Sequence, residues 1–173
     1  GESITTIKAE CRRLMVEEVR TKKGENKRVE FSVHTRDSMI AGSDKKVRLK
    51  SREVDYLHWD NKLTLEFNNK LPKIRSIHIT PLFYTPTIFL AGNSTVVDQA
   101  NEPWASWGQM IPTFFQPKVV FANYAESGET LKASKAERRL EKIWSLAKPG
   151  DYLFIEFAHN DQKPGSNHLD AFT

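Results

Sequence analysis

The second half of the chain alternates short apolar runs with segments of helical periodicity. Three runs are predominantly apolar, as is typical of strands buried on both faces of a sheet: residues 87–91, 119–124 and 152–157. Between them, residues 104–115 predict a short helix broken near Pro112, and residues 134–147 place apolar side chains at helical spacing. This alternation predicts an α/β fold in which a parallel sheet has helices on both faces.

In the first half, short β-like runs alternate with charged turns. Its β-like runs are residues 28–33, 46–50, 63–67 and 74–79. The run at 63–67 alternates apolar and polar side chains and is followed by the turn pair Asn68-Asn69, so we predict a hairpin whose second strand is 74–79. Residues 7–18 fit a helix as well as a strand.

A segment bounded by Pro81 and Pro86 separates the β-like first half from the alternating second half. We therefore predict two units: residues 1–85 as a β-rich, sandwich-like segment, with carbohydrate binding as one reading of it, and residues 86–173 as an α/β unit. A parallel sheet of only three strands leaves an apolar edge exposed, which predicts self-association or aggregation.

Composition narrows the class of protein. The chain has 173 residues, 39% of them hydrophobic and 10% aromatic, which suffices for a packed core. Its single cysteine, Cys11, cannot form an internal disulfide, and no Cys/His pair stands at zinc-ligand spacing. The apolar runs are too short to cross a bilayer, so no membrane partner is expected. The chain opens at Gly1 without a leader, and earlier removal of a secretion signal stays open.

Positive charge gathers in the first half of the chain. Residues 1–75 hold 18 Lys and Arg against 12 Asp and Glu, whereas the remainder holds 8 against 10, for a net charge of +4. An acidic polysaccharide or a nucleic acid would suit such a surface. The alternative is an ordinary solvated surface, which we favour because acidic residues are interleaved throughout. No recognisable nucleic-acid-binding module supports the nucleic-acid reading.

Small polar motifs follow all three strands of the predicted parallel sheet. Gly92-Asn93-Ser94-Thr95 follows the first, a loop containing Gly128 follows the second, and Asn160 follows the third. The carboxyl ends of parallel strands share one edge of a sheet, so these residues are expected to converge there.

These motifs resemble the sequence blocks of the SGNH (GDSL-like) hydrolases and, within them, rhamnogalacturonan acetylesterase-like proteins. The first block, a strand followed by Gly-Asp-Ser, is here residues 90–96; the second supplies Gly128; the third, Gly-His-Asn-Asp, is here Ala158-His159-Asn160-Asp161. The likeness extends over most of residues 86–173. Residues 57–67 resemble part of a β-sandwich that precedes this domain in some bacterial pectin-degrading relatives.

The resemblance implies a fold, a reaction and a set of site residues. The fold would be part of an SGNH-type, flavodoxin-like parallel sheet. Ser94 would be the nucleophile, and the backbone N–H groups of Ser94 and Gly128 with the side-chain amide of Asn160 would form the oxyanion hole. The reaction would remove acetyl groups from an acidic pectic polysaccharide without metal or cofactor. A secreted or periplasmic location is implied.

Two departures and one absence bear on the activity. Asn93 replaces the family's usual acid, Ala158 replaces its glycine, and no Asp-x-x-His block follows the third block. A serine hydroxyl without a base is a poor nucleophile. Of the nearby histidines, we expect His159 to have a structural role and His168 to face solvent. A catalytically inert carbohydrate-binding protein on an esterase scaffold is therefore the alternative.

Aromatic and basic side chains offer further candidates for sugar binding. Trp104 and Trp107 fall near the predicted site, where aromatic faces could stack on sugars, although core packing is favoured for both. Lys46, Arg48 and Lys50 would share one face of a strand and suit sugar carboxylates, and a solvated edge strand explains them equally well.

Overall fold

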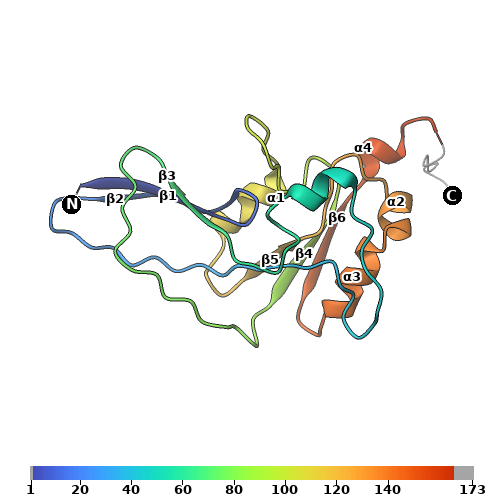
Figure 1. Cartoon of the computed structure of the whole chain (residues 1–173), viewed down its shortest axis with the longest axis horizontal. Coiled ribbons are helices and arrows are strands. Elements are labelled where there is room, and N and C mark those ends of the chain that lie inside the picture. The colour runs from blue at the N-terminus through green and yellow to red at the C-terminus, as the bar shows by residue number, and fades with distance from the viewer. Residues whose placement is uncertain (1, 166–173) are drawn as a thin grey trace.

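Two three-stranded sheets lie one beyond the other along the long axis of the molecule, one from each half of the chain (Figure 1). The computed structural model describes residues 2–165. In the first sheet, β1 (Ser3–Ala9) lies between β2 (Arg13–Thr21) and β3 (Leu65–Asn68), and both pairings are antiparallel. In the second, β4 (Thr87–Gly92) lies between β5 (Val120–Asn123) and β6 (Tyr152–Glu156), and both pairings are parallel.

The helices are short and most belong to the second half. They are η1 (Ser51–Asp55), α1 (Trp107–Met110), η2 (Ile111–Phe114), α2 (Leu131–Ala136), α3 (Arg139–Leu146) and α4 (Ala158–Asp161), where η marks a 3-10 helix. Within residues 2–165, none is long and apolar enough to cross a membrane.

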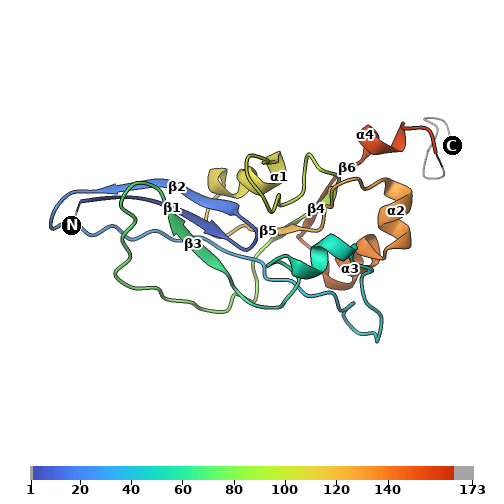
Figure 2. The ribbon, with the colours of Figure 1, turned by 45° about the horizontal axis from the view of Figure 1, so that its top comes forward.

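Alternate residues of β4 pack on opposite faces of the parallel sheet. Phe89 and Ala91 join a cluster that includes Ile143 of α3, whereas Ile88 and Leu90 join a second cluster against which Ile111 of η2 packs. Figure 2 shows α1 and α3 on opposite sides of these strands. The chain is therefore α/β, with helices on both faces of a parallel sheet, as predicted.

The sequence located the parallel strands well and the helices less well. Residues 134–147 form two helices instead of one, because Arg138 adopts a left-handed φ of 64° between α2 and α3. Residues 104–115 contain α1 followed by η2, with Pro112 in the first turn of η2, where a proline leaves no helical hydrogen bond unmade.

The predicted hairpin in the first half is wrong. β3 pairs with β1, about sixty residues earlier, instead of with residues 74–79, which form no strand. Side chains at every second residue of β1 are buried, whereas Ile74, Ile77 and Ile79 are all exposed. The apolar face of β3 therefore buries more surface against β1 than it would against residues 74–79. The helical alternative for residues 7–18 is also wrong, since β1 and β2 form a hairpin there.

The predicted strands at residues 28–33 and 46–50 are absent as well. The backbone there is irregular, and the nearest pairings are isolated bridges, such as Met39 with Lys46. Val47 is nevertheless buried, because its side chain packs into the cluster around Phe89 instead of onto a sheet. The β-rich character of residues 1–85 takes the form of one three-stranded sheet within the described residues.

The two edges of the parallel sheet differ. β5 is buried along its whole length, and the Arg13 guanidinium of β2 donates to the Phe121 carbonyl at 3.1 Å. β6 is mostly exposed although its sequence is apolar, with Tyr152 63% and Ile155 57% exposed. The apolar edge expected from a three-stranded sheet therefore lies at β6, and self-association through it stays a prediction.

Candidate active site

The turn after β4 is shaped by one glycine and one buried amide. A Cβ at Gly92 would lie 2.6 Å from both the Glu156 carbonyl oxygen and the Val96 side chain, so a larger residue does not fit. The fully buried Asn93 side chain donates from Nδ2 to the Phe157 carbonyl at 3.3 Å and accepts the Thr95 N–H at 3.0 Å. This turn holds Ser94, which is partly exposed.

Asn93 suits its surroundings better than the acid that usually stands in this position. Its Nδ2 group faces two carbonyl oxygens, those of Glu156 and Phe157, at 3.4 and 3.3 Å. A carboxylate has no hydrogen to donate and would set a negative charge against both. The departure is therefore accommodated by an amide that bridges β4 to the end of β6.

Hydrogen bonds tie the three motif segments to one another. The Gly92 carbonyl accepts the Glu126 N–H at 3.1 Å, which joins the first segment to the second. Asn93 joins the first to the third through Phe157. Asn160 Nδ2 donates to the Glu129 carbonyl at 2.9 Å, which joins the third to the second. The expected convergence at the carboxyl ends of the strands is therefore present.

A cavity of about 620 Å³ opens at this edge of the sheet. It is lined by Ser94, Thr95, Gln99, Trp104, Ala105, Ser106, Trp107 and Ser127. The first and second segments thus share the cavity through Ser94 and Ser127, whereas neither Gly128 nor Asn160 lines it. Within residues 2–165 the Ser94 hydroxyl makes no hydrogen bond, which leaves it available to a ligand.

The three proposed oxyanion donors have donor capacity to spare. Among the described residues, neither the Ser94 N–H nor the Gly128 N–H donates to a protein acceptor. Gly128 has a left-handed φ of 76°, which favours glycine, and open space where a Cβ would stand. Asn160 donates one of its two amide hydrogens to the Glu129 carbonyl, and its Oδ1 accepts a hydrogen bond from Lys163 Nζ at 2.8 Å.

The Gly128 loop is held by charged side chains from the first half of the chain. Arg52 donates to the Glu126 carboxylate at 2.8 Å and to the Ser127 carbonyl at 2.5 Å. Lys50 donates to the same carbonyl at 3.0 Å and forms an ion pair with Glu129. Burial raises the pKa of Glu129 to about 7, and the neighbouring Lys50 limits the rise. This support could not be predicted from the sequence, because no local pattern links Lys50 and Arg52 to a loop about 75 residues away.

No described histidine stands in the Ser94 cavity. His159 is exposed and has no side-chain partner within residues 2–165, so the structural role expected for it is not seen, and His168 lies outside the described residues. His34 contacts the Tyr124 hydroxyl at 2.9 Å, and burial lowers the pKa of its imidazole to about 3.

One Asp-x-x-His spacing does occur, ahead of the serine, at Asp55 to His58. His58 is 1% exposed and packs edge-on against Tyr56 and Trp59, with ring centroids 5.3 and 6.4 Å apart. Burial, followed by the charge of Arg36, holds its pKa far below the usual range. This histidine is buried beside Trp59 and does not line the Ser94 cavity.

The core packing predicted for Trp104 and Trp107 is wrong. Trp104 is 66% and Trp107 is 37% exposed, and both line the cavity beside Ser94. The reason lies in α1: its cap Ser106 donates to the Val97 carbonyl at 2.6 Å, and a Cβ at Gly108 would lie 2.1 Å from the Val96 carbonyl. This close approach presses α1 onto the turn after β4 and leaves the indoles at the rim.

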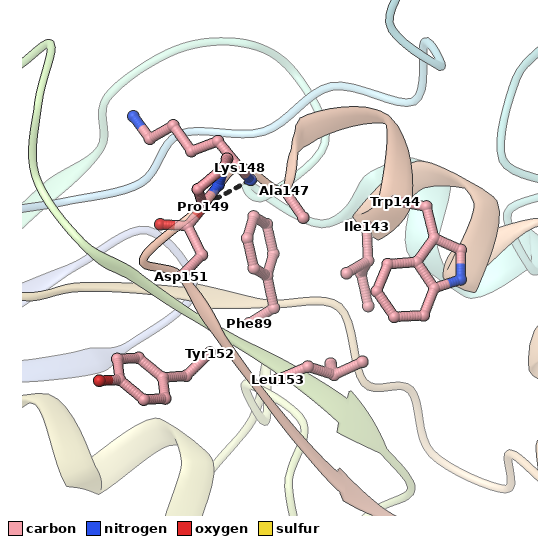
Figure 3. A pocket seen from close by; sticks show the side chains of 9 residues that line it. All are labelled: Phe89, Ile143, Trp144, Ala147, Lys148, Pro149, Asp151, Tyr152 and Leu153. Atoms are coloured by element: carbon pink, nitrogen blue, oxygen red, sulfur yellow. Dashed lines mark hydrogen bonds between the residues drawn. The ribbon is translucent and has the colours of Figure 1, made fainter.

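A second cavity, of about 290 Å³, lies at the opposite end of the parallel strands. Figure 3 shows Ile143 and Trp144 of α3 on one side of it and Tyr152 and Leu153, at the start of β6, on the other. It is remote from Ser94, since the chain enters β6 here and leaves it at Glu156.

Comparison with known proteins places the chain beside one group of enzymes. It is 43% identical over 79 residues to the rhamnogalacturonan acetylesterase RhgT of Bacillus subtilis, covering 44% of this chain and 34% of that protein. It is 35% identical over 77 residues to the probable rhamnogalacturonan acetylesterase YesY of Bacillus subtilis, covering 43% and 35%. It is 32% identical over 94 residues to a rhamnogalacturonan acetylesterase of Emericella nidulans, covering 54% and 36%.

This chain is related to rhamnogalacturonan acetylesterases. It matches about a third of the length of these relatives, and no protein-family model matches it. Among solved structures, the protein YxiM of Bacillus subtilis is 20% identical with a TM-score of 0.44, covering 95% of this chain and 42% of that one, a likeness too low to carry an argument. The resemblance seen in the sequence blocks is thus confirmed by the curated relatives.

Proposed function

We propose that this chain carries the nucleophile and oxyanion hole of a serine esterase that removes acetyl groups from an acidic pectic polysaccharide. The observation that carries the proposal is the hydrogen-bonded convergence of three segments at one edge of the sheet, where Ser94 lines a cavity. The similarity to rhamnogalacturonan acetylesterases supports the choice of ester and polymer.

In this mechanism the Ser94 Oγ attacks the acetyl carbonyl carbon. The carbonyl oxygen becomes an oxyanion, which accepts hydrogen bonds from the Ser94 and Gly128 N–H groups and the Asn160 amide. Each such donor typically contributes about 2.7–4 kcal/mol to the transition state. The bond to the sugar oxygen then breaks, the sugar leaves as an alcohol, and water releases acetate from the acyl-serine. The chemistry requires no metal or cofactor.

The serine also requires a base, and we propose that it comes from outside residues 2–165. None of the four described histidines, His34, His58, His78 and His159, lines the cavity. A Ser–His pair accelerates attack because the imidazole accepts the hydroxyl proton as the bond forms.

The test is acetate release from acetylated rhamnogalacturonan. It compares this chain and the longest natural polypeptide that contains it with the Ser94→Ala and Ser127→Ala forms of the latter. Ser127 is the matched control, because it lines the same cavity and its hydroxyl has no part in the mechanism. We expect Ser94→Ala to abolish release and Ser127→Ala to keep most of it; turnover that survives Ser94→Ala would defeat the assignment.

A second candidate is a carbohydrate-binding protein that has the esterase scaffold and no activity. The absence of a histidine from the cavity, within residues 2–165, favours it. Polysaccharide binding that is unchanged in Ser94→Ala, with no acetate released by any form of the protein, would establish this candidate instead.

We also propose that residues 1–85 and 86–173 are two units that fold against each other and act outside the cell or in the periplasm. The interface between them is supported by buried ion pairs, Arg13 with Asp98 and Glu53 with Arg139. A location outside the cytoplasm follows from a polysaccharide substrate, and fractionation of the native source would check it.

A further inference from the structure

We propose that Trp104 and Trp107 form a sugar-binding wall in the Ser94 cavity and hold the pyranose ring that carries the ester, with Glu156 setting the position of the Trp107 indole. The proposal rests on the proposed function for the identity of the ester, but its test is one of binding. The ligand is a carbohydrate with hydroxyl groups at the ring edge and C–H groups on its face.

Two exposed indoles on the rim of one cavity call for a ligand. Trp59, by contrast, is buried in the hydrophobic core, as expected for a tryptophan whose role is packing. Trp104 and Trp107 are instead open to the space that Ser94 and Ser127 also reach. Binding sites for small ligands typically combine aromatic walls with a few placed polar groups, and the polar groups here include Gln99 and Thr95.

Trp107 is fixed before any ligand arrives. Its Nε1 donates to the Glu156 carboxylate at 2.7 Å, and the Thr95 hydroxyl donates to the other oxygen of the same carboxylate. Glu156 ends β6, so the indole is anchored to the sheet. A ring held this way loses little conformational freedom on binding, which favours affinity.

Trp104 is held through its backbone and keeps its indole N–H free. Arg12, in the turn between β1 and β2, donates to the carbonyl oxygens of Trp104 and Gln99, each at 3.1 Å. The first half of the chain therefore fixes the loop that carries Trp104. Within residues 2–165 its indole N–H has no partner, so it can donate to a sugar hydroxyl.

A sugar fits this wall better than an apolar protein segment does. The lining combines the two indoles with hydroxyl and amide side chains, namely Ser94, Thr95, Ser106, Ser127 and Gln99, and one alanine. It contains no Leu, Ile, Val, Met or Phe, which an apolar protein anchor would pack against. Mixed aromatic and hydroxyl surfaces match a ring that has both C–H faces and hydroxyl edges.

The test measures the dissociation constant for acetylated rhamnogalacturonan oligosaccharides by calorimetry, with Ser94→Ala in every variant so that no ester is cut during the titration. We expect Trp104→Ala and Trp107→Ala each to raise the dissociation constant by about 2- to 12-fold, the range of an aromatic contact. Trp144→Ala is the matched control, because Trp144 is 63% exposed and lines the remote cavity (Figure 3). It should leave binding unchanged.

Glu156 is tested through the same titration. Glu156→Ala frees the Trp107 indole and should weaken binding, whereas Glu156→Gln keeps an acceptor for the indole N–H and should restore most of the affinity. Thermal melting of each variant shows whether the fold is intact. A fold-wide effect would weaken both Glu156 variants alike and would contradict the positioning role.

The proposal is overturned if the Trp104 and Trp107 variants bind like their parent, if Trp144→Ala weakens binding as much, or if the parent does not bind the oligosaccharides. Binding of an apolar peptide at this wall in preference to sugar would also overturn it. Failure of the esterase proposal looks different, because the binding pattern would persist while no form of the protein released acetate.

Discussion

Replacing Asp98 by Asn should lower the free energy of unfolding by about 3–5 kcal/mol, because it removes the hydrogen-bonded counter-charge of the buried Arg13 guanidinium. The side chains of Arg13 and Asp98 are 1% and 0% exposed, and their closest atoms lie 2.6 Å apart. Arg13 also donates to the Phe121 carbonyl, and Asn123 donates to Asp98 at 2.9 Å, so neither group can turn toward water.

The size of the effect follows from burial. An exposed pair in the same chain, Lys45 with Glu141, lies 3.3 Å apart with side chains 52% and 43% exposed, and such pairs contribute about 0–1 kcal/mol. A loss of 3–5 kcal/mol is a large part of the roughly 5–15 kcal/mol by which domains are stable. It would lower the Tm by about 6–20 °C in a chain of this size.

Urea unfolding followed by tryptophan fluorescence measures the effect, with Glu141→Gln as the control. The double variant Arg13→Met with Asp98→Leu should regain most of the loss, because an apolar pair of similar volume requires no counter-charge. The reasoning is refuted if Asp98→Asn lowers the free energy of unfolding no more than Glu141→Gln does. It is also refuted if the double variant loses as much stability as Arg13→Met and Asp98→Leu lose when their separate effects are added.

Three further outcomes are expected. Asn160→Ala should reduce acetate release by about 100- to 1000-fold with little change in KM, since it removes one oxyanion donor, and an unchanged kcat would exclude that role. Gly128→Ala should cost about 1–2 kcal/mol of stability from backbone strain alone, because φ is 76° and nothing lies near the new methyl group, and denaturant unfolding measures it. Burial raises the pKa of Glu129 from 4.5 to about 7, so the folded state keeps a proton that the unfolded state has lost between those values. Stability should therefore fall as pH rises from about 4.5 to 7, and Glu129→Gln should flatten that fall in melting curves across the range; an identical pH profile in the variant would count against it.

Positioning an ester and attacking it have different requirements, and no base for the attack lines the Ser94 cavity within residues 2–165. The cavity is lined by Ser94 and two indoles, which we propose position an ester. Attack by the hydroxyl also requires a proton acceptor. The binding and turnover assays therefore test two proposed properties of one site separately, namely sugar binding by the indoles and ester cleavage by Ser94 with its base.

The sequence by itself determined the parallel sheet and the residues at its edge. The runs that became β4, β5 and β6 are predominantly apolar, as strands of a parallel sheet usually are, although only β4 and β5 are buried along most of their length. The motifs around Ser94, Gly128 and Asn160 directly follow these strands, so the parallel arrangement alone brings them to one edge.

Only the tertiary structure decided the partners. A period-two pattern shows which face of β3 is apolar but not which strand covers it, and β1 proved to be the neighbour instead of residues 74–79. The exposure of Trp104 and Trp107 likewise depended on the close packing of α1 on the turn after β4. The supports that Arg12, Lys50 and Arg52 give to the cavity loops span about 75–92 residues of sequence, and contacts over such distances leave no local signature because they depend on the whole folded chain.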